Sequence, residues 1–221
     1  MRPPLEGPLE ALLFDLDGTL VDSYEAIHES LAFAMTEKGL PPLSYEAVRR
    51  MVGRGLEVLI GEAMGEENVA EGVALFRSRY RVVFLGKTRL LPGVFESIRA
   101  LHGSGRRLAV CSNKPGYFSS DILAQLGLRD CFAAVLGPEH TRSPKPDPEM
   151  LHLALARLEV PPSRTLYVGD MPMDVVVARA AGVPVAVVPT GSSTREELEA
   201  AWPDLILEDI RALLDVLEEP R

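Results

Sequence analysis

The sequence of 221 residues predicts an α/β fold, a doubly wound parallel sheet that carries an inserted α-helical cap domain. Three observations favour this fold. From residue 90 onward short apolar runs alternate with helix-like stretches, the region before it holds helical patterns only, and polar residues follow several of the apolar runs. Strands that alternate with helices are typical of a parallel sheet with both faces covered.

The predicted strands are compact runs rich in Val, Leu and Ala. Continuous apolar runs of this length fit strands that are buried on both faces, as in a parallel sheet. The first run leads directly into an acidic turn, whereas the others are separated by helical patterns. The five predicted strands are residues 11–14, 108–111, 133–136, 166–168 and 185–188.

Helical periodicity fills the segments between these strands. Val94, Ile98 and Leu101 recur at intervals of four and three residues, which places them on one face of a helix. The other helices predicted in this part of the chain are residues 118–126, 148–158, 173–181 and 209–217.

Residues 22–88 interrupt the alternation, because this stretch contains no convincing strand. A first amphipathic helix, marked by Ile27, Leu31 and Met35, ends at Gly39. Further helices are predicted at residues 48–52, 56–64 and 69–84. The sequence therefore predicts a core domain over residues 1–21 and 89–221 and a helical cap domain over residues 22–88. A cap that leaves the sheet after the first strand would cover the strand ends, where α/β folds bind ligands.

Composition excludes several classes of function. Hydrophobic residues make up 47% of the chain and the net charge is −9, so a sizeable core is expected and no basic surface for nucleic acid. No run is long enough to span a membrane and no secretory signal pattern is present, which predicts a cytoplasmic protein. Cys111 and Cys131 lack metal-ligand spacing and are expected to be buried free thiols.

The first strand ends in paired acids, Asp15 and Asp17, followed by Gly18. Alternate residues of an extended segment point the same way, and neighbouring carboxylates repel unless a cation or proton lies between them. Gly18 permits a sharp turn whose N–H groups can face an anion. These residues favour a metal-assisted site for phosphate chemistry over a solvated Asp-Gly turn.

Three later strand ends carry further polar groups. Ser112 can hold a phosphoryl oxygen or serve as a helix cap, and Lys145 stands in a proline-rich loop that could fix its ammonium group or leave it solvated. Asp170 and Asp174 add two carboxylates, although an acid such as Asp174 is also favoured in the first turn of a helix. Four acids at neighbouring strand ends need a divalent cation, and oxygen-only ligands indicate Mg²⁺.

The ordered set of Asp-x-Asp-Gly-Thr, Ser, Lys-Pro and Gly-Asp-x₃-Asp resembles the four motifs of the haloacid dehalogenase superfamily, most members of which are phosphatases. The resemblance covers essentially the whole chain and implies a Rossmann-like core. Residues 169–182 and 191–198 look most like the phosphoglycolate phosphatase-like branch, which has a helical cap. Met171 and Pro172 depart from that pattern, because the branch more usually has Thr or Ser after Gly-Asp.

The resemblance implies a role for each motif residue in a Mg²⁺-dependent phosphatase. Asp15 would attack phosphorus to form an aspartyl-phosphate, and Asp17 would act as general acid and then as general base. Lys145 would offset negative charge at the reacting centre. The phosphoryl oxygens would contact Gly18, Thr19, Ser112, Asn113 and Lys145, and the metal ligands would be Asp15, the Asp17 carbonyl, Asp170 and Asp174. A small phosphate ester is the expected partner, in a monomer or homodimer.

Substrate choice is expected to depend on the cap, where Arg54 lies between two glycines and could reach a substrate anion or remain on the surface. Several alternatives to a phosphatase of phosphoglycolate-like esters stay open at this point. They are a phosphomutase of the β-phosphoglucomutase type, a pyrophosphatase or nucleotidase of the same branch, a receiver domain, and a binding protein without catalysis.

Overall fold

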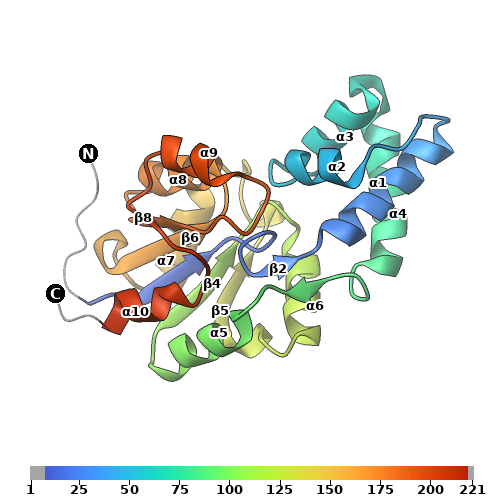
Figure 1. Cartoon of the computed structure of the whole chain (residues 1–221). Helices are drawn as coiled ribbons and strands as arrows, with labels where there is room; N and C mark the ends of the chain where they lie inside the picture. Colours follow the sequence, from blue (N-terminus) through green and yellow to red (C-terminus); the bar gives the residue numbers. More distant parts are fainter. Residues whose placement is uncertain (1–7, 219–221) are drawn as a thin grey trace.

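The computed structural model describes residues 8–218, which form a central sheet of six parallel strands with a helical segment at one end (Figure 1). The strand order is β5-β4-β1-β6-β7-β8. The chain therefore adds β4 and β5 on one side of β1 and then β6, β7 and β8 on the other side. The strands are β1 (Ala11–Phe14), β4 (Arg107–Cys111), β5 (Phe132–Leu136), β6 (Thr165–Gly169), β7 (Val185–Val187) and β8 (Leu205–Ile206).

Alternate residues of the strands face opposite sides of the sheet. Leu12 and Phe14 belong to one buried cluster with α5 (Val94–Gly103), α6 (Gly116–Gln125) and α10 (Ala212–Glu218). The intervening residues Ala11 and Leu13 belong to a second cluster on the other face. That cluster contains side chains of α7 (Glu149–Leu158), α8 (Pro172–Ala180) and α9 (Arg195–Ala200). Both faces of β1 are therefore covered, as its unbroken apolar run predicts.

Four α-helices separate β1 from the rest of the sheet, and we call them the helical insertion. They are α1 (Tyr24–Glu37), α2 (Tyr45–Met51), α3 (Leu56–Met64) and α4 (Val69–Val83). The insertion lies at one end of the sheet (Figure 1), and a short antiparallel pair of strands, β2 (Val21–Asp22) and β3 (Arg89–Leu90), joins it to the core. Buried side chains of α1 and α4 continue the hydrophobic cluster that starts on β1.

The five predicted strands and the predicted helices are present, with bounds that differ by a few residues. The expectation of no strand within residues 22–88 is wrong at its margin, because Asp22 belongs to β2. Strands β2, β3 and β8 have two residues each and were not predicted, since so short a run has no readable alternation. The division into core and cap stays a prediction, and residues 1–7 and 219–221 of the predicted core lie outside the described part.

Two predictions from composition can be compared with this fold. Cys111 and Cys131 are both buried and unbridged, as expected. Among the helices of residues 8–218, none combines the length and the apolar composition that crossing a bilayer requires.

Candidate active site

The polar motifs converge at the carboxyl ends of the central strands. Asp15 directly follows β1 and Asp170 directly follows β6, and these two strands are hydrogen-bonded neighbours. The chain order reverses at β1, so the helices that follow the strands diverge to opposite faces and leave room at this edge. The site therefore lies where an open α/β sheet binds its ligands.

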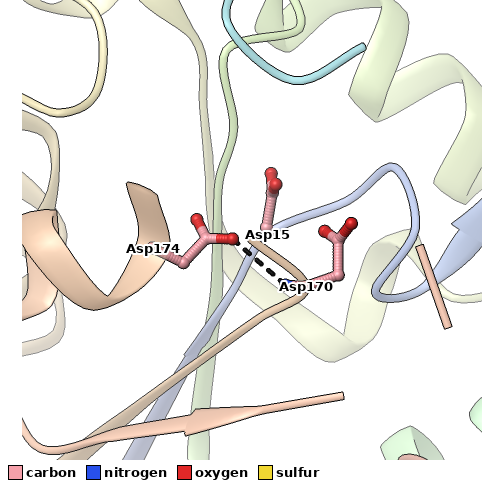
Figure 2. A group of neighbouring side chains, drawn as sticks. All are labelled: Asp15, Asp170 and Asp174. Atoms are coloured by element: carbon pink, nitrogen blue, oxygen red, sulfur yellow. Dashed lines mark hydrogen bonds between the residues drawn. The ribbon is translucent and has the colours of Figure 1, made fainter. Parts of the chain in front are cut away.

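Asp15, Asp170 and Asp174 form a buried acidic cluster (Figure 2), in which one carboxylate oxygen of each residue lies within 4.8 Å of the others. Asp174 stands in the first turn of α8. Its Oδ2 accepts hydrogen bonds from the backbone N–H groups of Asp170 (3.1 Å) and Met171 (3.0 Å). Asp174 therefore caps α8 and at the same time orients the turn that carries Asp170.

Lys145 is the cation of this cluster. Its fully buried ammonium lies 3.2 Å from Oδ1 of Asp15 and 2.9 Å from Oδ1 of Asp174, and it donates to the Tyr167 hydroxyl at 2.7 Å. Burial alone would lower the pKa of Lys145, but the charges of Asp15 and Asp174 outweigh burial and raise that pKa above its usual range. The ammonium is therefore charged and fixed beside the Asp15 carboxylate.

The acids of the cluster are held in an environment that disfavours their negative charge. The pKa of Asp15 is raised to about 6, chiefly by burial. The charge of Lys145 opposes this rise, and the charge of Asp174 adds to it. Burial, with the nearby charges of Asp174 and Asp15, also raises the pKa of Asp170 well above its ordinary value. One ammonium does not balance three carboxylates, so this oxygen-rich cluster fits a divalent cation.

A second observation supports a cation at the cluster. The Tyr24 hydroxyl is buried and makes no hydrogen bond within residues 8–218. This hydroxyl and Oδ2 of Asp170 each lie 2.5 Å from the point that a Cβ on Gly18 would occupy. An unpartnered hydroxyl beside carboxylate oxygens is a group that a bound cation or its water would satisfy.

The turn after β1 is shaped by Gly18, whose φ of +81° is unfavourable for other residues. The space beside it is filled by Asp170, Tyr24 and Gly191. Thr19 donates from Oγ1 to Oδ1 of Asp170 at 3.2 Å. The turn thus places the residues that follow β1 against Asp170, which follows β6. A side chain at position 18 would have no room.

Asp17 lies outside the acidic cluster and contacts a different cation. Its Oδ2 lies 3.0 Å from the ammonium of Lys114, and its Oδ1 accepts a hydrogen bond from the Ser23 hydroxyl at 2.5 Å. Lys114 also donates to the hydroxyl of Tyr80, on α4, at 2.7 Å. The charge of Asp17 outweighs burial and raises the pKa of Lys114 above its usual range. The two acids of the first motif therefore have separate lysine partners.

Asn113 links the core to the helical insertion. Its side-chain amide donates to the carbonyl oxygens of Gly53 and Lys145, both at 3.1 Å, and its Oδ1 accepts from the backbone N–H of Lys145 at 2.9 Å. The neighbouring Ser112 is buried and accepts from the backbone N–H of Lys114 at 3.3 Å. Asn113 thus positions the loop of Lys145 and contacts the insertion above the site.

A cavity of about 70 Å³ separates the strand ends from the helical insertion. Asp15, Asp17 and Ser112 line it on the core side. Most of the lining from the insertion is apolar, contributed by Ile27, Val52, Leu56, Leu59, Phe76 and Tyr80. The catalytic candidates therefore face a small space with a largely apolar roof, in which an electrostatic interaction is stronger than in water.

The structure brings nine of the ten predicted site residues together at this edge of the sheet. Arg54 is different: it contacts both carboxylate oxygens of Glu62 at 2.6 Å, its side chain is half exposed, and it does not line the cavity. A specificity role for Arg54 stays a prediction without support from these contacts.

Three partners of the site were not singled out from the sequence. Lys114 follows Ser112 and Asn113 at the same strand end, so its place in the motif was a usable signal. Tyr167 lies inside the apolar run of β6, and Tyr80 lies on a helix of the insertion. Nothing local in the sequence marks these two tyrosines, because only the tertiary fold brings their hydroxyls to Lys145 and Lys114.

Comparison with known proteins agrees with this arrangement. Residues 12–188 match the family model for haloacid dehalogenase-like hydrolases. A phosphoglycolate phosphatase of Rhodospirillum rubrum is 36% identical over 223 residues, covering 96% of this chain and 92% of that protein. A phosphoglycolate phosphatase of Pseudomonas putida is 34% identical over 218 residues, covering 95% of this chain and 80% of that protein.

Solved structures show the same fold. A predicted phosphoglycolate phosphatase from Haemophilus somnus superposes with a TM-score of 0.85 at 27% identity, covering 95% of this chain and 98% of that one. The match to the family model spans most of the chain, and the relatives align over nearly all of it. The chain therefore belongs to the haloacid dehalogenase-like hydrolase family, as its motifs predicted.

Proposed function

We propose that this hydrolase is a Mg²⁺-dependent phosphatase that cleaves a small phosphate monoester of the phosphoglycolate type through an aspartyl-phosphate intermediate. The observation that carries the proposal is the pairing of each acid of the first motif with its own buried lysine, Asp15 with Lys145 and Asp17 with Lys114. Two carboxylates in different surroundings can perform two different tasks, one as nucleophile and one as acid and base. The names of the relatives support the choice of substrate type.

In the first step a carboxylate oxygen of Asp15 forms a bond to phosphorus while the bond from phosphorus to the ester oxygen breaks. Asp17 donates a proton to the departing alkoxide, which leaves as an alcohol. The fixed charge of Lys145 lessens the repulsion between the Asp15 carboxylate and the phosphate dianion. Covalent catalysis of this kind divides one difficult displacement into two easier ones.

In the second step a water molecule attacks the phosphorus atom of the aspartyl-phosphate. Asp17, now a carboxylate, accepts a proton from that water, and Asp15 is released as the free carboxylate. The hydrogen bond from Ser23 and the ion pair with Lys114 hold the Asp17 carboxylate in one orientation for both steps. A single residue can therefore serve as acid and base in turn.

The metal would be held by Asp15 and Asp170, with the Asp17 carbonyl as a further ligand and Asp174 acting through water or as an orienting partner. When bound, Mg²⁺ supplies positive charge that offsets the charge of the phosphoryl group. Oδ1 of Asp174 accepts from Lys145 and Tyr167, and its Oδ2 accepts from two backbone N–H groups. Because both oxygens already have two partners, these contacts favour the role of orienting partner. Cytoplasmic location and oligomeric state stay predictions.

The cavity supports a small substrate over a nucleotide. Its volume of about 70 Å³ is small for a ligand cavity, and residues of the helical insertion line it opposite the strand ends. A nucleotidase would need this roof to open around a base and a ribose. A phosphomutase would accept a substrate of intermediate size but would return the phosphoryl group to the organic molecule rather than to water.

The test is phosphate release from a panel of phosphate compounds, namely the esters phosphoglycolate, a sugar phosphate and a nucleotide, and the anhydride pyrophosphate, with Mg²⁺ and with EDTA. We expect Mg²⁺-dependent release that is fastest with phosphoglycolate. Asp15→Asn is expected to reduce release by at least about a thousand-fold, because the amide cannot attack phosphorus. Arg81→Gln serves as a matched control, because Arg81 of α4 is exposed and does not line the cavity, and it is expected to retain activity. Absence of release from every ester would contradict the proposal, and phosphate transfer between sugars would favour the mutase.

A further inference from the structure

We propose that Arg77, on α4 of the helical insertion, binds a carboxylate group of the substrate and so selects two-carbon phosphoesters that carry a second anion. This inference rests on the proposed phosphatase function and names the substrate class more closely. Arg77 replaces Arg54 as the residue expected to set specificity. Three features lead to the assignment: its position at the cavity, its unpartnered Nε, and the charge balance of the site.

Arg77 lines the same cavity as Asp15 and Asp17. It enters from the opposite side, on α4, together with Phe76 and Tyr80 of the same helix. Because the cavity is a single small space, a molecule with its phosphoryl group at Asp15 extends toward the residues of the insertion. The distal end of a short substrate is therefore within the region that Arg77 borders.

The guanidinium of Arg77 has hydrogen-bonding capacity that the protein does not use. Its Nε is buried and makes no hydrogen bond within residues 8–218. Its one ion pair, with Glu57, is long at 3.4 Å, and both side chains are partly exposed. A buried N–H donor without a partner is unfavourable, so a ligand that accepts from it gains affinity.

Lys114 is the other cation among the residues that line the cavity, and it is already engaged. Its ammonium contacts Asp17 at 3.0 Å and donates to Tyr80 at 2.7 Å. Arg77 is thus the lining cation with an unused buried donor. The apolar side chains of Leu59 and Phe76 line the same cavity, and apolar surroundings strengthen an ion pair formed there.

The shape of the guanidinium points to a carboxylate. Arginine presents parallel N–H donors that match the two oxygens of a carboxylate. A second phosphate would match the charge as well, but the small cavity volume of about 70 Å³ favours the smaller carboxylate. A two-carbon ester with a terminal carboxylate fits the charge of Arg77 and the small volume of the cavity.

The experiment compares phosphoglycolate with 2-hydroxyethyl phosphate, which has the same length but a neutral alcohol in place of the carboxylate. The quantity measured is the ratio of kcat/KM for the two esters in wild type and variants. We expect Arg77→Met to lower this ratio by about 10- to 100-fold, the range for a lost charge-assisted hydrogen bond. Arg77→Lys keeps the positive charge but loses the paired N–H donors of the guanidinium. Its ratio is expected to lie between those of wild type and Arg77→Met.

Arg81→Met is the matched control, because Arg81 lies one turn further along α4, is exposed and does not line the cavity. Its ratio is expected to equal that of wild type. The inference is overturned if Arg77→Met slows both esters equally or leaves the ratio unchanged while wild type hydrolyses phosphoglycolate. If wild type hydrolyses neither ester, the proposed function fails and the role of Arg77 fails with it.

Discussion

Asp17 is the residue whose surroundings most closely define its task. A proton donor to a leaving alkoxide must stay in one orientation, and it must exchange its proton without a large rearrangement. Ser23 contacts one oxygen of Asp17 and Lys114 contacts the other, while Asp17 still lines the cavity. The lysine is itself fixed by Tyr80, so the position of the acid depends on a helix of the insertion.

Lys114→Met is expected to reduce kcat/KM by about 10- to 100-fold, because it removes a charge-assisted contact to Asp17 and keeps the apolar length of the side chain. Steady-state kinetics with phosphoglycolate measures the effect. Lys87→Met is a suitable control, because Lys87 follows α4, forms ion pairs with Glu25 and Glu29 of α1 and does not line the cavity. Equal activity in the two variants would show that Asp17 works without its lysine partner.

At the scale of elements, the contact between α4 and α6 joins the helical insertion to the core beside the site. Phe118 of α6 packs edge to face against Tyr80 and Phe84, with ring centroids 5.0 Å apart in both pairs. Tyr80 in turn stacks on Phe76, and the ammonium of Lys114 lies over the Tyr80 ring, 4.8 Å from its centroid. Packing between these helices therefore determines where Lys114 and Arg77 lie.

Phe118→Ala is expected to lower the free energy of unfolding by about 3–5 kcal/mol, because it removes a buried ring and leaves a cavity in this cluster. Phe95→Ala removes a ring of the same size that is 43% exposed, and is expected to cost about 1 kcal/mol or less. Urea denaturation of both variants measures the difference. Similar losses for the two would mean that the aromatic cluster does not stabilise the junction.

Much of the fold and most of the site could be predicted because their signals are local. The strand ends at Asp15, Ser112 and Asp170 combine an apolar run with a polar residue, and parallel strands bring those ends to one edge. Helix α9 was missed because five of its six residues are exposed and only Leu198 is buried, so it has no apolar periodicity. The role suggested for Arg77 depends on which helix face meets the cavity, which spacing alone does not determine.

At the scale of the whole molecule, stability and function oppose each other at the acidic cluster. Burial beside other carboxylates raises the pKa of Asp170 well above its ordinary value and that of Asp15 to about 6. Above about pH 4 these two carboxyl groups therefore bind more protons in the folded protein without metal than in the unfolded chain. The contribution of these two groups to stability is greatest near pH 4 and below, and it falls as the pH rises, because their ionisation is easier in the unfolded state.

Magnesium is expected to reverse this loss. A cation that binds only the folded state at a hundred times its Kd stabilises that state by about 2.7 kcal/mol. For a chain of 221 residues this corresponds to a rise in Tm of roughly 5–10 °C. Thermal melts at pH 7.5 with Mg²⁺ and with EDTA measure the shift.

Asp170→Asn separates the two effects, because it keeps the shape of the side chain and removes its charge. The amide oxygen can still accept from the Ser192 N–H, and the Thr19 hydroxyl can turn to accept from the amide nitrogen. In EDTA the variant is expected to be at least as stable as wild type at pH 7.5, with a weaker decline in stability between pH 4 and 7. Its Tm is expected to change little with Mg²⁺. A variant that is less stable than wild type in EDTA yet responds normally to Mg²⁺ would show that Asp170 supports the fold rather than the metal.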